Sequence, residues 1–381
     1  MRFLNTFILL LIFLSSCTDE GIVLKPNWDL PPKDLGSSVK LSHNNLLVSI
    51  EVPKSTFSFI KTSNSGIFDN DDSLKKYTQL IESKFKDNFD FIFFINNSQR
   101  LSTQNYGVCW PISNKISGIG GGVFENNLRI SNSKKLQSII TLTDEKGLTS
   151  GPSLHEICHN WANRLNSDLF KSVDAYRANF IEIDAGPHWG FSSIHGQLGG
   201  FDLSTLKTLT DLPNHYHAEG LPSKKPTFGL VANEGNMLKY APFELYLMGL
   251  IPKSSVPDIT LFSGISVTPD FLNDGNFFAK SKKTLSVNQV ILETKVGERV
   301  PDFKSSQKLF RAIVVVLTEF PLESSGMSGY SGWRFYENEV KKFFGKESWM
   351  FSTAGNVVYT FWGATNNEAF IKADELNLEL K

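Results

Sequence analysis

Residues 152–165 read PSLHEICHNWANRL and form the most informative segment of the sequence. Pro152 suits the first turn of a helix, and the apolar residues after it recur at helical spacing. Positions i and i+4 of a helix share one face, so His155 and His159 can direct imidazole nitrogens at one metal ion. Glu156 is rotated by about 100° from His155, which is the position of a general base in this motif. The segment therefore predicts a metal-binding helix that carries a hydrolytic carboxylate.

A structural use of Glu156 is the alternative. Ser153 and Glu156 stand three residues apart, which is the spacing of a capping box at the start of a helix. A carboxylate engaged in that way would compete with catalysis.

A catalytic zinc ion needs a third protein ligand and an open fourth position. The longer metzincin motif does not supply the ligand, because Leu165 and Ala162 occupy the positions of its third His and its Gly. Two candidates remain downstream, His188 and Glu244. Glu244 also has a structural alternative, as a charge near a helix N-terminus that the helix dipole stabilises.

Several blocks of the sequence resemble, in the same order, a group of bacterial zincin-like proteins. The blocks are Ile116–Gly120, HEICHNW, His188–Phe191 followed by Gly199-Gly200, and Ala241–Pro252. Together they span about residues 105–260, and the last block is the most specific. The resemblance implies a zinc metallopeptidase fold, with a His where His188 stands and an acidic residue where Glu244 stands.

We expect Glu244 to be the third zinc ligand, because a Glu on a second helix packed against the first is the gluzincin arrangement. His188 would then donate to the oxyanion of the transition state, and Tyr240 is a further candidate donor, with aromatic packing as its alternative role. In the second interpretation His188 binds the metal and Glu244 orients a ligand imidazole.

The remaining histidines offer a weaker signal. Six of the seven His lie between residues 155 and 217. His195, His215 and His217 could form a second metal site, but a solvent-exposed polar loop is the favoured interpretation of His215 and His217.

The first residues have the layout of an exported lipoprotein. Arg2 precedes an apolar run at residues 7–14 that is too short to span a bilayer. The LSSC run at residues 14–17 resembles a bacterial lipobox, in which the Cys becomes the acylated first residue. We expect a signal peptide over residues 1–16, lipidation of Cys17, and anchoring in the cell envelope, at the outer membrane or surface more than at the inner membrane. An ordinary cleaved signal peptide is the alternative.

Two cysteines remain once Cys17 is acylated. Cys109 and Cys158 could form one disulfide or stay as buried thiols. We favour buried thiols, because a metal-binding helix normally faces the core.

Apolar patterning predicts an α+β fold. Residues 46–52, 89–95, 136–142 and 310–320 read as strands, and residues 74–85, 152–165, 242–250 and 333–344 as helices. We expect a zincin-like metallopeptidase fold in which a mixed sheet packs on the metal-binding helix, with a mainly helical C-terminal part. The expected divisions are an acylated Cys and tether at 17–45, a catalytic domain at 46–265 and a C-terminal extension at 266–381.

Composition limits the partners. The 381 residues are 41% hydrophobic and 12% aromatic, enough for a large core. Lys plus Arg number 38 against 39 for Asp plus Glu, which leaves no positive surplus for a phosphate backbone, so no nucleic-acid partner is expected.

The sequence as a whole predicts zinc-dependent hydrolysis of a peptide or protein substrate. One zinc ion is expected per chain, with Glu156 activating a zinc-bound water and the membrane reached through the N-terminal lipid. The alternative function is that of a catalytically inactive zincin-like surface lipoprotein that acts in binding or adhesion.

Overall fold

A computed structural model of the chain describes residues 31–53, 71–97, 107–121, 127–143, 146–162, 165, 168–174, 180–220, 228–229, 232–233, 235–323, 332–351, 356–374 and 376–381. The expected signal peptide and Cys17 lie outside these residues. Among the helices described here, none is both long and apolar enough to cross a membrane.

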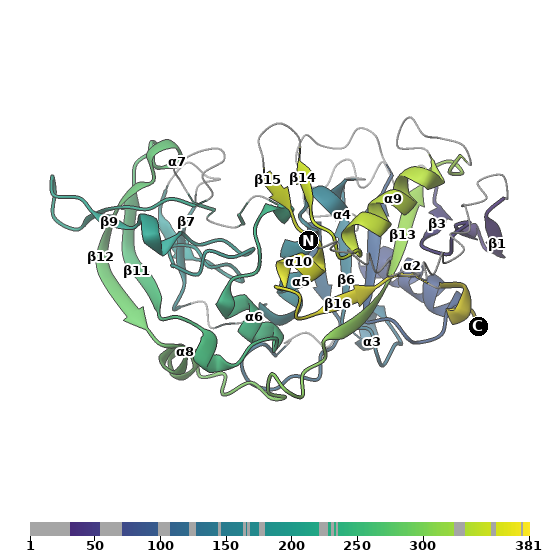
Figure 1. Ribbon diagram of the computed structural model, residues 1–381, viewed down its shortest axis with the longest axis horizontal. Coiled ribbons are helices and arrows are strands. Elements are labelled where there is room, and N and C mark those ends of the chain that lie inside the picture. The colour runs from purple at the N-terminus through teal and green to yellow at the C-terminus, as the bar shows by residue number, and fades with distance from the viewer. Residues whose placement is uncertain are drawn as a thin grey trace, which may run out of the picture.

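The main sheet, within the described residues, has eight strands in the order β1-β2-β3-β13-β4-β6-β5, with β16 paired to β13 (Figure 1). The strands are β1 Lys33–Gly36, β2 Val39–Leu41, β3 Val48–Glu51, β4 Phe91–Asn96, β5 Gly107–Pro111, β6 Ser138–Leu142, β13 Leu309–Thr318 and β16 Phe370–Lys372. The central strands β3, β13, β4 and β6 are parallel, whereas β2 and β5 run antiparallel to their neighbours in the sheet. The sheet is therefore mixed, as predicted.

Helices lie on both faces of this sheet. The described helices are α2 Asp71–Lys84, α3 Asn127–Ile130, α4 Gly147–Ser150, α5 Ser153–Ala162, α6 Pro242–Met248, α7 Phe271–Asp274, α8 Val287–Thr294, α9 Trp333–Phe343 and α10 Phe361–Ala364. The core on one face contains residues of α2, and the core on the other contains residues of α5, α6 and α9.

The side chains of β4 alternate between the two faces of the sheet, and both faces are covered, which explains its unbroken apolar sequence. Phe91, Phe93 and Ile95 enter the core that contains α5, and Ile92 and Phe94 enter the core that contains α2. Successive side chains of a strand point to opposite faces, so a strand covered on both faces is apolar at every position. The apolar runs predicted as buried strands are the centre of the sheet for this reason.

A second, smaller sheet stands beside the first in the order β11-β12-β10-β9 (Figure 1, left). Its strands are β9 Lys207–Thr208, β10 His215–His217, β11 Ile259–Val267 and β12 Asn276–Leu285. Two short hairpins complete the described strands: β7 Lys171–Val173 with β8 Glu182–Asp184, and β14 Trp349–Phe351 with β15 Asn356–Val358. The smaller sheet covers its own aromatic core, which includes Phe191, Phe262 and Phe277.

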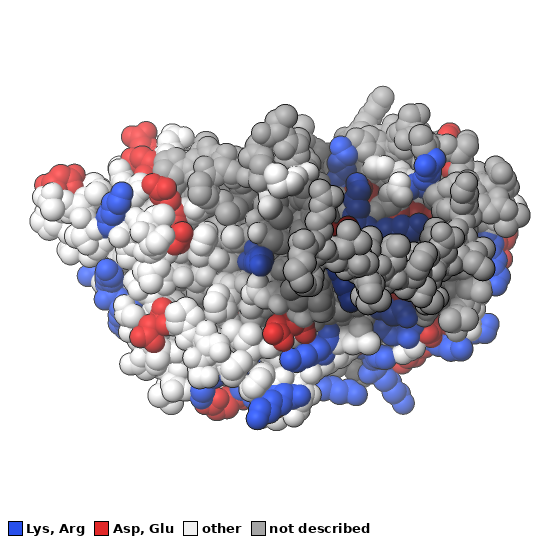
Figure 2. All heavy atoms as spheres, in the orientation of Figure 1, with Lys and Arg blue, Asp and Glu red and all other residues white. Residues whose placement is uncertain are grey.

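Charge is distributed in both signs over the surface drawn in Figure 2. Basic side chains gather along its lower right and acidic ones are interspersed with them. This pattern agrees with a formal net charge of −1.

The α+β class is confirmed, and each predicted helix and strand is present with ends that shift by a few residues. Two expected boundaries are wrong. The tether at 17–45 is too long, because β1 and β2 already pair with the sheet from Lys33 onward. The extension at 266–381 is not separate, because β13 lies between β3 and β4 in the middle of the sheet.

The C-terminal part is also not mainly helical. Besides the helices α7, α8, α9 and α10, residues 266–381 contain the strands β12, β13, β14, β15 and β16. Its strand β13 forms parallel pairs with strands from far earlier in the chain, and periodicity alone gives no such long-range partner.

Candidate metal centre

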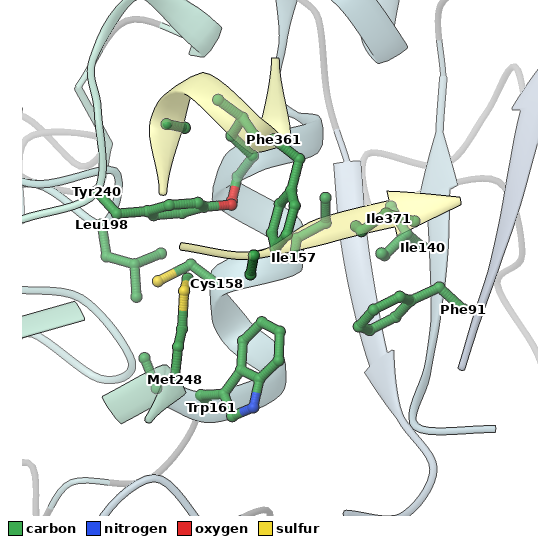
Figure 3. Packing of buried hydrophobic residues seen from close by; sticks show 14 of the residues in the cluster. Phe91, Ile140, Ile157, Cys158, Trp161, Leu198, Tyr240, Met248, Phe361 and Ile371 are labelled. Atoms are coloured by element: carbon green, nitrogen blue, oxygen red, sulfur yellow. The ribbon is translucent and has the colours of Figure 1, made fainter. Parts of the chain in front are cut away.

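Helix α5 is buried at every position and packs on β5, β6 and α6. Ile157, Cys158 and Trp161 are buried in one core, in which Trp161 packs on Phe91 of the sheet and Cys158 points away from the sheet toward Met248 (Figure 3). With three apolar side chains fixed in this core, the helix cannot rotate without exposing them. The two histidines of the helix are therefore held in one direction.

The start of α5 is fixed by a buried amide. Asn236 donates from Nδ2 to the carbonyls of Leu148 and Thr149, at 3.0 Å each, and its Oδ1 accepts from the backbone N–H of Leu154 at 3.1 Å. The hydroxyl of Ser153 donates to the Leu148 carbonyl at 2.6 Å. Asn236 Oδ1 thus caps this end of the helix, and no Ser153–Glu156 capping box forms, because the Glu156 N–H donates to the Pro152 carbonyl at 2.9 Å.

Three imidazole rings converge beside the helix. His155 Nε2 lies 3.0 Å from His159 Nε2 and 3.4 Å from His188 Nε2. Nitrogens bound to one tetrahedral zinc ion at about 2.0–2.1 Å are separated by roughly 3.3 Å. Both distances are close to this separation, and the possible ligand atoms of all three histidines lie within 4.8 Å of one another. Within the described residues, these histidines form the one group of three or more possible ligands close enough to hold a metal.

Burial keeps these imidazoles neutral, which is the form that binds metals. It lowers the pKa of His155 to about 4 and that of His188 to about 3. The pKa of His159 is lowered well below its ordinary value, first by burial and then by its neighbours His155 and His188. At neutral pH no proton has to leave before a cation enters.

The carboxylate of Glu156 lies between α5 and β5. Its side chain is 5% exposed, and burial raises its pKa to about 8, while the backbone of Cys109 on β5 acts in the opposite direction. A Cβ added at Gly107 would stand 2.7 Å from Glu156 Cγ and 3.0 Å from Oε1. A glycine at this strand position is therefore what allows the carboxylate to lie against β5.

Glu244 is not a member of the histidine group, and its four nearest donors explain why. Oε1 accepts from Trp189 Nε1 at 2.8 Å and from the N–H of Leu198 at 2.9 Å. Oε2 accepts from the N–H groups of Gln197 at 3.0 Å and Ala241 at 2.9 Å. These donors occupy the roughly four acceptor sites of a carboxylate. The preference for Glu244 as third ligand is therefore corrected, and the geometry favours His188, the alternative.

Tyr240 is also displaced from the predicted role of oxyanion donor. Its hydroxyl donates to the carbonyl of Leu154 at 2.8 Å, and its ring is buried against Phe361 (Figure 3). Burial raises the pKa of this phenol well above its ordinary value. Tyr240 supports α5 instead of facing a substrate.

The other histidines stand apart from the group. His215 pairs with Asp211 at 2.7 Å and stacks on Phe278, and His217 lies 2.9 Å from Glu219 Oε1. Both are half-buried on β10, so the expectation of a fully exposed loop is wrong, and no second metal group forms among the described residues. His195 is also half-buried, and burial lowers its pKa.

Cys109 and Cys158 are free thiols in the structure. Burial, followed by the charge of Glu244, raises the pKa of Cys158 well above its ordinary value. Burial likewise raises the pKa of the Cys109 thiol. Neither group is activated as a nucleophile.

Sequence reasoning missed the residues that position the candidate metal ligands and Glu156. Asn236, Gly107 and the carbonyl of Gln197 have no chemistry of their own to signal a role. One hint of these residues is present in the sequence: the glycines around Gln197 are closely spaced, which indicates a tight turn. No protein-family model, curated protein or solved structure matches this chain.

The histidine group predicts the metal content of the purified protein. We expect about one zinc ion per chain by elemental mass spectrometry, and less than a tenth of that in His155→Ala and His188→Ala, because each variant removes one of three ligands. His215→Ala is the control and should keep its zinc. Full occupancy in His188→Ala would contradict the assignment of the third ligand.

Proposed function

We propose that the chain is a zinc-dependent hydrolase of peptide bonds with a zincin-like fold. One observation carries the proposal: three neutral imidazole nitrogens converge within 4.8 Å, and a buried carboxylate follows the first of them on the same helix. Imidazole nitrogens and a neighbouring Glu are the parts that metal-assisted hydrolysis requires.

Each residue has a distinct task in this proposal. Zinc would be held by His155, His159 and His188, with its fourth coordination position open. When bound, the zinc ion supplies a Lewis acid for the scissile carbonyl and the attacking water. Glu156 takes the proton from that water and passes it to the leaving amine. A pKa near 8 suits this task, because a general base works best when its pKa is close to the working pH.

The position of β5 supports a peptide as the substrate. β5 stands at one end of the described order of the main sheet and pairs with β6 on one side. An extended peptide can add to such an edge through backbone hydrogen bonds. Because Gly107 at the start of β5 lies against Glu156, a peptide on this edge would pass close to the proposed base.

We also propose that the domain is held at a membrane surface. The support is the sequence of residues 7–17, in which an apolar run ends at Cys17. A lipid on Cys17 would confine the hydrolase to substrates within reach of that surface.

The role of Glu156 predicts a separation of metal binding from turnover. We expect Glu156→Gln to keep one zinc per chain and to lose about 10²- to 10⁴-fold in kcat/KM on an unstructured peptide library, since the amide cannot take a proton. Wild type and His215→Ala serve as active controls from the same preparation. Turnover that survives in Glu156→Gln, with contaminating peptidase excluded, would reject Glu156 as the base.

The contact between Gly107 and Glu156 predicts that a larger side chain at position 107 lowers activity by displacing the Glu156 carboxylate. In Gly107→Ala the new Cβ would lie 2.7 Å from Glu156 Cγ and 2.8 Å from Pro152 Cγ, so the carboxylate must move. A displacement of this size costs about 10- to 100-fold in kcat/KM while zinc content stays at one per chain. Val108→Ala on the same strand is the control and should retain activity. Unchanged turnover in Gly107→Ala would show that Glu156 needs no fixed position.

Lipidation of Cys17 predicts that the protein incorporates a labelled fatty acid. Cells that express the full chain with a radioactive or alkyne fatty acid should incorporate the label, and Cys17→Ser should abolish it. Cys109→Ser is the control and should be labelled like wild type. Label that persists in Cys17→Ser would place the lipid on another residue, and a wild type that takes up no label would reject the lipid anchor.

A further inference from the structure

A single peptide group connects His155 to Glu244. The carbonyl of Gln197 lies 2.9 Å from His155 Nδ1, and the N–H on the other side of the same peptide, that of Leu198, donates to Glu244 Oε1 at 2.9 Å. A carbonyl oxygen only accepts, so His155 carries its proton on Nδ1. Its other nitrogen, Nε2, then presents a lone pair to His159 and His188.

Glu244 is an unusual group to find at this depth. Its side chain is 0% exposed, and its described partners are four N–H donors and the Cys158 thiol, with no cation among them. A buried carboxylate is costly unless hydrogen bonds and an opposite charge compensate it. The four N–H groups supply the hydrogen bonds, and a divalent cation at the histidine group would supply the charge.

From this arrangement we infer that Glu244 is a positioning residue for the metal centre and acts through the peptide between Gln197 and Leu198. The inference rests on the metal centre of the proposed function. A negative charge at the N–H end of a peptide strengthens its carbonyl as an acceptor, because hydrogen bonds in a chain polarise one another. The stronger acceptor holds the His155 ring in one orientation and makes Nε2 a better metal ligand.

The turn that carries this peptide is shaped for the carboxylate. The N–H of Gly196 donates to the carbonyl of Gly199 at 2.9 Å, and the reverse bond is 3.1 Å. This closure directs the N–H groups of Gln197 and Leu198 to the same side, where both bind Glu244. A Cβ at Gly196 would lie 2.3 Å from Glu244 Cδ, so a residue with a side chain cannot stand there without displacing the carboxylate.

Glu244 also reaches His188, the proposed ligand on the loop, through Trp189. The Trp189 indole donates to Oε1, and the Trp189 N–H donates to the carbonyl of Leu198 at 2.9 Å. Trp189 directly follows His188, so the same carboxylate fixes the backbone next to that ligand. Glu244 thus joins the supports of two proposed ligands that are 33 residues apart in the sequence.

The test compares zinc affinity among wild type, Glu244→Gln and the matched control Glu293→Gln in the full chain, by competition with a chromophoric chelator, with circular dichroism to verify the fold. The amide of Gln removes the charge and turns one acceptor into a donor that faces N–H groups. We expect zinc to bind about 10- to 100-fold more weakly in Glu244→Gln. Glu293→Gln makes the same change on an exposed side chain of α8, so it should change zinc affinity less than about threefold.

The outcomes separate this inference from the proposed hydrolysis. Equal zinc affinity in wild type and Glu244→Gln overturns the positioning role and leaves the proposed function intact. Weaker zinc binding in Glu244→Gln, combined with a wild type that cleaves no peptide, supports the positioning role and rejects hydrolysis. A wild type that takes up no zinc overturns both.

A measurement on wild type keeps the inference falsifiable if Glu244→Gln does not fold. Nitrogen-15 NMR of the zinc-loaded protein reports which ring nitrogen of His155 carries the proton and how fast that proton exchanges. We expect a proton on Nδ1 that is protected from solvent. A His155 ring protonated on Nε2 would overturn the link through Gln197.

Discussion

The carboxylate of Glu244 is the interaction on which the proposed site depends most. It receives N–H groups from the 196–199 turn, from Ala241 and from Trp189, so three separate segments meet at one buried charge. Two of these segments support His155 and His188, the candidate ligands that must meet across the fold. Loss of the carboxylate would leave buried N–H groups without acceptors, which costs about 1–3 kcal/mol for each group left unsatisfied. The placement of the ligands and the local stability are thus coupled.

The surrounding scaffold sets the chemical state of the three histidines and of Glu156, the proposed catalytic groups. Helix α5 is clamped by apolar contacts to the sheet and by Asn236 at its first turn, so its polar side chains stay in a water-poor environment. Desolvation disfavours charge, and it therefore acts in opposite directions on acids and bases. The imidazoles lose their affinity for protons, whereas Glu156 gains affinity. One buried environment produces both a set of neutral ligands and a carboxylate adapted to carry a proton.

Local sequence patterns predicted the parts of the structure that local physics determines. The apolar runs of β4 and β13, the helix α5 and the pair His155 and His159 follow from periodicity and spacing within one element. The third ligand did not follow, because His188 and Glu244 lie on other segments and only the fold decides which side chain reaches the ion. A backbone carbonyl such as that of Gln197 leaves no trace in composition. The boundary at 265 failed for a related reason, since β13 pairs with β4, 221 residues earlier (Ala312 with Phe91), and with β3, 267 residues earlier (Val315 with Val48).

The central claim is that one zinc ion is bound by three histidines, two from α5 and one from the loop before Trp189. The most direct measurement is a crystal structure of the zinc-loaded protein, with data collected on both sides of the zinc absorption edge. The account predicts one strong anomalous peak about 2.0–2.1 Å from Nε2 of His155, His159 and His188, with Glu244 still bound to the 196–199 turn. A peak coordinated by the Glu244 carboxylate, or one located away from His188, would contradict it.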